Sequence, residues 1–174
     1  MKFRIATGLH GAAYAGQIDL VEQLLNQGAE VNARWGQEGK TPLHLAAESP
    51  KEERIRVAKL LLERGADINA MDEAGWTPLT TAVLTPHLDM VKLLIERGAN
   101  VNAKAKQGWT ALHSAVGYSE AHIEAVRLLL NAGAKINQKS IDGWTPLTRA
   151  RRDGRTEILT ILKTHERRPW WRPW

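Results

Sequence analysis

Four segments of the chain carry apolar residues at helical spacing, and each segment is followed by a glycine. Residues three and four positions apart share one face of a helix, so each segment predicts a helix with one apolar face in a core. The glycines predict where these helices end, because glycine readily adopts the left-handed conformation at a helix C-terminus. The apolar residues are Val21, Leu24 and Leu25; Val57, Leu60, Leu61 and Leu62; Val91, Leu93, Leu94 and Ile95; and Val126, Leu128, Leu129 and Leu130. The glycines are Gly28, Gly65, Gly98 and Gly133.

Five shorter helices are predicted, each opening at a threonine. The threonine hydroxyl can accept a hydrogen bond from an amide of the first helical turn. Proline follows three of the threonines, at a position that tolerates its missing N–H. Small pairs such as Ala46-Ala47 and Ala82-Val83 allow neighbouring helices to approach closely. The threonines are Thr7, Thr41, Thr77, Thr110 and Thr145, with spacings of 34, 36, 33 and 35 residues.

This period indicates a stacked repeat array. Each repeat of such an array buries its apolar surface against its neighbours, and the stack presents an extended face to another macromolecule. With 43% hydrophobic and 25% charged residues, the chain has the composition of a folded, soluble protein.

The repeated phrase resembles the ankyrin repeat family. The resemblance rests on Thr41-Pro42-Leu43-His44, the alanine pair, the leucine run and endings such as Gly65-Ala66-Asp67-Ile68-Asn69, and it covers about residues 5–165. It implies an all-α solenoid of five helix pairs joined by β-turn fingers, with a concave face made by the fingers and the first helices. The implied single domain spans residues 1–166, with repeats at about 5–34, 38–70, 74–103, 107–137 and 142–165, and an Arg/Trp/Pro-rich tail at 167–174.

The resemblance also implies which positions face the concave groove. The residue before the opening threonine is Lys40, Trp76, Trp109 or Trp144, and the three tryptophans predict a ladder of interface anchors. Alternatively, these indoles are packing residues that buttress neighbouring fingers. The groove positions of the first helices are Tyr14, Glu48, Leu84, Tyr118 and Arg152.

Three histidines, His10, His44 and His113, fall in the opening phrase and invite a metal-binding or catalytic interpretation. The resemblance instead implies a structural role, in which the imidazole hydrogen-bonds the backbone of a finger. No cofactor, metal site or catalytic residue is predicted, since the chain has no cysteine, phosphate-binding loop, HExxH motif or nucleophile elbow. The sequence therefore predicts that the protein is not an enzyme.

The net charge of +5 is concentrated at the C-terminus. Residues 1–148 hold 16 basic and 16 acidic residues, whereas residues 149–174 hold eight basic and three acidic ones. The tail interleaves arginine, proline and tryptophan, which predicts an extended path with cation–π contacts. Three interpretations remain for Trp170, Trp171 and Trp174: they cap the last repeat, they enter a cleft of a partner, or they bind an anionic surface.

The sequence thus predicts a non-enzymatic module that binds a folded protein through its concave face. Its small size favours a stoichiometric inhibitor or regulator of a partner enzyme, of the immunity type. The alternative is a targeting protein whose basic, tryptophan-rich tail docks on anionic lipid or nucleic acid. We expect a monomer by itself, a protein partner rather than a nucleic acid, and contact with a membrane only through the tail. The compartment stays open: cytoplasmic, or periplasmic or secreted if a leader has been removed.

Overall fold

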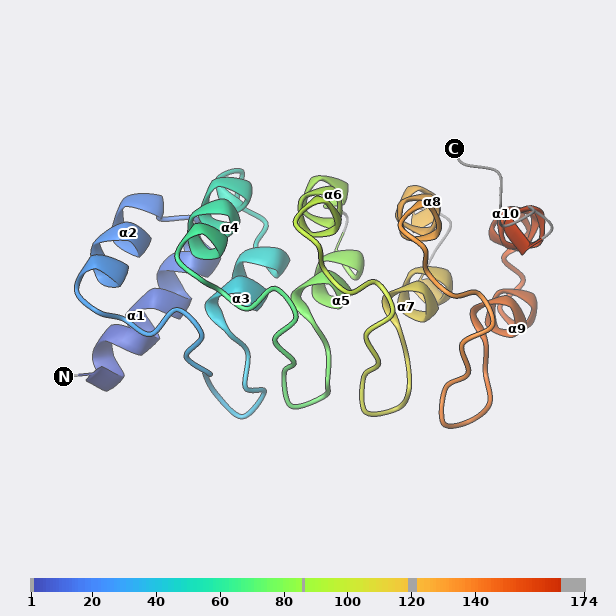
Figure 1. Ribbon diagram of the computed structural model, residues 1–174, viewed down its shortest axis with the longest axis horizontal. Helices are drawn as coiled ribbons and strands as arrows, with labels where there is room; N and C mark the ends of the chain where they lie inside the picture. The colour runs from blue at the N-terminus through green and yellow to red at the C-terminus, as the bar shows by residue number, and fades with distance from the viewer. Residues whose placement is uncertain (1, 86, 119–121, 167–174) are drawn as a thin grey trace. The chain divides into compact units, whose positions relative to one another are not determined.

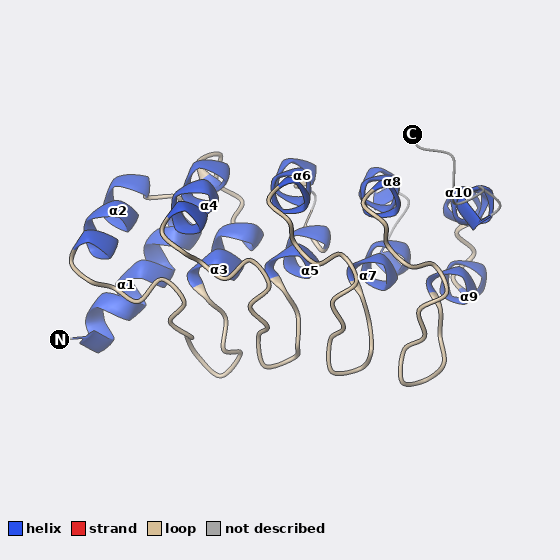
Figure 2. Ribbon diagram, viewed as in Figure 1, coloured by secondary structure: helices blue, strands red, loops and turns tan. Residues whose placement is uncertain are grey.

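A computed structural model describes residues 2–85, 87–118 and 122–166, and these ranges form ten helices and no β-strand (Figure 2). The all-α fold of five helix pairs is therefore confirmed. The helices are α1 (Lys2–Ala15), α2 (Ile18–Asn26), α3 (Pro42–Glu48), α4 (Arg54–Glu63), α5 (Pro78–Val83), α6 (Leu88–Glu96), α7 (Ala111–Tyr118), α8 (Ile123–Asn131), α9 (Pro146–Arg152) and α10 (Thr156–Glu166). The chain divides into two compact units, residues 1–100 and residues 101–174.

The first unit contains three helix pairs arranged in two rows (Figure 1). Helices α1, α3 and α5 pack side by side in one row, and α2, α4 and α6 form the other. Their apolar faces meet in a continuous core. The largest fully buried side chains of this unit include Leu9, Leu43, Leu61, Leu79, Met90 and Leu94.

The second unit contains two helix pairs, α7 with α8 and α9 with α10. Helix α7 packs on α9, and α8 packs on α10. Its fully buried core residues include Leu112, Leu129, Leu130, Ile158 and Leu162. No helix in the described ranges combines the length and the apolar composition that crossing a membrane requires.

The local signals at the helix ends are largely confirmed. Thr41, Thr77 and Thr145 are the N-cap residues of α3, α5 and α9, and a proline follows each of them. The long helices end as predicted, because Gly28, Gly65, Gly98 and Gly133 all have φ of 85° or 86°.

One predicted helix start is wrong. Thr7 lies inside α1, which begins at Lys2, so it is not an N-cap. Gly8 stands where the other repeats have proline or alanine. The residues before Thr7 are already helical from Lys2 onwards, so the threonine does not mark a boundary here.

Asparagines at the ends of the repeats connect successive turns. The Asn32 side chain accepts a hydrogen bond from the Asp67 amide at 2.7 Å and donates one to the Gly65 carbonyl at 3.2 Å. In the second unit, Asn102 accepts from the Lys135 amide at 2.9 Å and donates to the Gly133 carbonyl at 3.1 Å. These bonds satisfy backbone groups that the helix ends leave unpaired, and they set the spacing between neighbouring repeats.

Candidate protein-interaction site

The fingers are hairpin-like loops that hold the residue before each opening threonine in a fixed place. An amide on the outgoing side donates to the carbonyl of that residue on the returning side, which closes the loop. The pairs are Trp35 with Lys40 at 2.9 Å, Asp72 with Trp76 at 2.9 Å, Ala105 with Trp109 at 2.8 Å and Ser140 with Trp144 at 2.8 Å. Lys40 and the three tryptophans therefore occupy equivalent, backbone-anchored positions.

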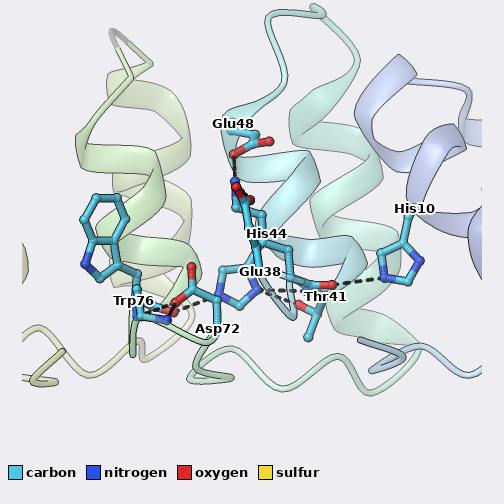
Figure 3. A network of polar contacts seen from close by, with 9 residues as sticks. His10, Glu38, Thr41, His44, Glu48, Asp72 and Trp76 are labelled. Atoms are coloured by element: carbon cyan, nitrogen blue, oxygen red, sulfur yellow. Dashed lines mark hydrogen bonds and ion pairs between the residues drawn. The ribbon is translucent and has the colours of Figure 1, made fainter. Parts of the chain in front are cut away.

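His44 is fully buried and connects its own repeat to the next finger (Figure 3). Its Nε2–H donates to the Trp76 carbonyl at 2.9 Å, and its Nδ1 accepts from the amide and the hydroxyl of Thr41 at 3.2 and 2.8 Å. Burial lowers the pKa of His44, which keeps the ring neutral and able to accept at Nδ1.

His113 repeats this arrangement in the second unit, where Nε2 donates to the Trp144 carbonyl at 3.0 Å and Nδ1 contacts Thr110. The Nε2 atom of His10 lies 2.8 Å from the Ala33 carbonyl and 3.1 Å from the Lys40 carbonyl. The structural role that the resemblance implied for these histidines is confirmed. Among the described residues, no three His, Cys, Asp or Glu side chains are grouped so that they could hold a metal ion.

The hydroxyl groups that replace histidine in the third and fifth repeats act only locally. Thr80 Oγ1 lies 3.3 Å from Thr77 Oγ1, and Thr148 Oγ1 accepts from the Thr145 amide at 2.8 Å. The short side chain thus reproduces the contact of the imidazole with the cap residue. The threonine side chain is shorter than the imidazole, so it replaces the contact with the cap residue but not the hydrogen bond to the next finger.

The three tryptophans of the equivalent positions are half-buried, neither enclosed in the core nor fully exposed. In the second unit, arginine side chains lie over two of the rings. The Arg149 guanidinium carbon is 4.1 Å from the Trp109 ring centroid, and that of Arg152 is 4.8 Å from the Trp144 ring. These cation–π contacts hold the indoles and the guanidinium groups in one layer at the surface.

Asp153 links the two stacked arginines. Its Oδ1 accepts from Arg152 Nε at 2.7 Å, and its Oδ2 lies 3.4 Å from Arg149 Nε. The hydrogen bond from Arg152 and the charges of the neighbouring arginines lower the pKa of Asp153. Burial lowers the pKa of Arg149, whose side chain is only 16% exposed. The pair of guanidinium groups is therefore ordered from both sides, by indole rings and by one carboxylate.

Gly117 provides the room for Arg149. A Cβ atom at this position of α7 would lie 2.3 Å from Arg149 Nε. We expect Gly117→Ala to keep or raise the free energy of unfolding by up to about 1 kcal/mol, since alanine favours a helix over glycine. The flexible Arg149 side chain must move away, so the indole N–H resonance of Trp109 should shift in NMR spectra.

The matched control for this prediction is Gly11→Ala in α1, where an added Cβ meets nothing within 4 Å. This variant should gain similar stability without any change at Trp109. An unmoved Trp109 resonance in Gly117→Ala would show that Arg149 does not cover the ring in solution.

Lys40 occupies the tryptophan position of the second repeat, but its charge is already paired. Its Nζ lies 2.8 Å from Glu48 Oε2 and 2.9 Å from Glu38 Oε2. Burial lowers the pKa of Lys40, but hydrogen bonds to the two carboxylates outweigh it and leave this pKa raised. Two predicted groove positions, Lys40 and Glu48, thus bind each other through a hydrogen bond from Lys40 Nζ to Glu48 Oε2.

Two of the other predicted contact residues, Tyr14 and Leu84, belong to the first unit. Tyr14 near the end of α1 is 45% exposed, and Leu84, the C-cap of α5, is half-buried. The side chain of Tyr118 and the tail residues Trp170, Trp171 and Trp174 lie outside the described part of the chain.

Sequence reasoning missed the role of Arg149, whose guanidinium lies over the Trp109 ring. Ile141, a residue of the last finger, is 76% exposed. The signal that could have revealed Arg149 is the glycine at position 117, which interrupts an otherwise ordinary helix.

Paired helices, closed fingers and inter-repeat imidazole bonds together define a helical repeat protein. The family model described as ankyrin repeats (3 copies) matches residues 4–72, 57–140 and 104–169, so this chain belongs to the ankyrin repeat family. Ankyrin repeats mediate protein–protein interactions, and the proteins that carry them are generally non-enzymatic interaction modules.

Several curated proteins are similar to part of the chain. Ankyrin repeat and SOCS box protein 6 of Homo sapiens is 44% identical over 77 residues, which cover 44% of this chain and 18% of that protein. Neurogenic locus Notch protein of Drosophila melanogaster is 48% identical over 64 residues, or 37% of this chain and 2% of that protein. NF-kappa-B inhibitor cactus of the same species is 40% identical over 72 residues, which cover 41% of this chain and 14% of that protein. The matched segments therefore span less than a fifth of each of these relatives.

Proposed function

We propose that this protein is a non-enzymatic module that binds a folded protein partner through its fingers and first helices, and that it acts as a stoichiometric inhibitor or regulator of that partner. The observation that carries the proposal is the layer of half-buried tryptophans and stacked arginines in the second unit. Tryptophan and arginine are the residues most enriched in interface hot spots.

Preorganisation supports the same proposal. Side chains that are already ordered lose little conformational entropy when a partner binds, so more of the interaction energy appears as affinity. Trp109 and Trp144 are fixed by the finger backbone and by guanidinium groups before any partner arrives. One relative bears the name of an inhibitor, NF-kappa-B inhibitor cactus, which is consistent with a regulatory use of such a surface.

The proposed contact residues extend over both units, within one binding domain of residues 1–166 followed by the tail. They comprise Trp76, Trp109, Trp144, Lys40, Tyr14, Leu84, Tyr118 and Arg152, with Trp170, Trp171 and Trp174 of the tail as a second point of contact.

Affinity capture from the native organism tests this proposal. The wild-type chain should retain a protein partner at equal stoichiometry, and the double variant Trp109→Ala/Trp144→Ala should weaken the complex at least about 30-fold, the loss expected for hot-spot residues. The matched control is Leu20→Ala, which removes a 38% exposed apolar side chain from α2 in the other helix row. Absence of any protein partner at micromolar concentration would contradict the proposal.

The charge of the C-terminus supports a second candidate, targeting to an anionic surface. Deleting residues 167–174 separates the two functions. Retained partner binding favours the finger face, whereas loss of salt-sensitive binding to anionic vesicles or nucleic acid would favour targeting by the tail.

A further inference from the structure

We propose that the stacked arginine pair of α9, Arg149 and Arg152, is the docking site for an acidic segment of the protein partner. The inference rests on the proposed function and names the chemistry of the partner at one part of the surface. Both arginines belong to the second unit and lie over the tryptophans of its two fingers.

The geometry of the stacks suits a carboxylate. A guanidinium that lies flat on an aromatic ring keeps its N–H donors in the plane of the group, where they match the two oxygens of a carboxylate. Asp153 accepts a hydrogen bond from Arg152 Nε at 2.7 Å and lies 3.4 Å from Arg149 Nε. The contact with Asp153 shows that a carboxylate can bind a stacked guanidinium within this chain. The Arg152 side chain remains 50% exposed and is accessible to a partner.

The local charge is not balanced by that contact. Within the described ranges, one carboxylate, Asp153, faces two guanidinium groups, and the charge of Arg155 also acts on it. Arg149 Nε is buried and makes no hydrogen bond that satisfies ordinary geometry, although Asp153 lies nearby. A second carboxylate at the exposed edge of Arg152 would therefore balance positive charge that the described residues leave in excess here.

The net positive charge of the second unit also favours an acidic partner. Residues 1–100 contain 11 basic and 13 acidic residues, whereas residues 101–174 contain 13 basic and six acidic ones. An acidic protein would be steered towards the second unit and away from the first.

An acidic protein fits this surface better than a nucleic acid does. Proteins that bind single strands offer open aromatic faces for the bases to stack on, but the Trp109 and Trp144 rings each carry a guanidinium over one face. A carboxylate needs only the edges of the guanidinium groups, which leaves both stacks intact.

Titration of the full chain with a peptide of six glutamates tests the proposal. The peptide should shift the indole N–H resonances of Trp109 and Trp144 in NMR spectra but not those of Trp35 and Trp76, and the affinity should fall as salt is added. A peptide of six glutamines is the matched ligand and should produce no shift. Binding of the two peptides with equal affinity would overturn the proposal.

Variants with opposite expected effects sharpen the test. Arg152→Gln, which changes a half-exposed side chain, and Arg149→Gln should each weaken peptide binding about tenfold, a magnitude typical of a charge-assisted hydrogen bond. Asp153→Asn should strengthen binding, because it removes the carboxylate that competes for the same N–H groups. Arg151→Gln on the same helix controls for net charge alone. An equal loss in Arg151→Gln and Arg152→Gln would contradict a specific site.

The outcomes distinguish this inference from the proposed function. If affinity capture returns a partner but the glutamate peptide does not bind, the acidic docking site is wrong and the binding function stands. If the peptide binds and no partner is captured, the arginine pair does bind acidic segments, and the proposed protein-binding function is wrong. A single-stranded oligonucleotide could also bind more tightly than the glutamate peptide and lose this binding in Arg152→Gln. That outcome would show that the arginine pair binds a nucleic acid and not an acidic protein.

Discussion

Replacing His44 with alanine should lower the free energy of unfolding by about 2–4 kcal/mol, since each buried polar group left without its partner costs about 1–3 kcal/mol. His44 is 0% exposed and serves three polar groups, the Trp76 carbonyl and the amide and hydroxyl of Thr41. Alanine cannot replace any of these contacts and leaves a cavity as well. Urea unfolding followed by circular dichroism measures the difference, and Lys92→Ala on the exposed face of α6 should change stability by less than about 0.5 kcal/mol.

The pH dependence of stability is a second readout of the same side chain. Burial lowers the pKa of His44 from its ordinary value of 6.5, so the unfolded chain takes up a proton more readily than the folded one. The wild-type protein should therefore lose stability as the pH falls below about 6.5. His44→Ala removes one of the groups responsible and should flatten this dependence in part, because burial also lowers the pKa of His113. A variant with wild-type stability and an unchanged pH profile would contradict the structural role of the imidazole.

The sequence predicts the fold well where the chemistry is local. A threonine cap, a proline in the first turn and a glycine at the end each act within a few residues, so α3, α5 and α9 begin at the predicted threonines. Thr7 shows the limit of this reasoning. A threonine caps a helix only where the chain before it leaves the helical conformation, and α1 continues through Thr7 from Lys2.

The candidate site was less predictable because its contacts join distant residues. Arg149 reaches Trp109 across 40 positions of sequence, and it does so only because Gly117 leaves space for the guanidinium. Similarly, the pairing of Lys40 with Glu38 and Glu48 depends on how the finger folds back over α3. Side-chain positions of this kind are set by packing in three dimensions, and a pattern of residue types along the chain does not contain them.

Leu61→Ala should have the largest effect of all, a loss of about 2–5 kcal/mol in the free energy of unfolding. Leu61 is 0% exposed in α4, and α4 packs against α2, α3 and α6 within the first unit. In a repeat array each interface depends on the repeats on both sides, so a cavity in a central repeat weakens its contacts with both neighbours.

The matched control is Leu20→Ala on α2, which removes the same atoms from a side chain that is 38% exposed. Its cost should stay below about 1 kcal/mol, because little apolar surface returns to water and no enclosed cavity forms. Both variants should be measured by urea unfolding at the same pH. Equal losses in the two variants would mean that burial between neighbouring repeats is not what stabilises the protein. The fixed positions of the finger tryptophans would then have to depend on other contacts.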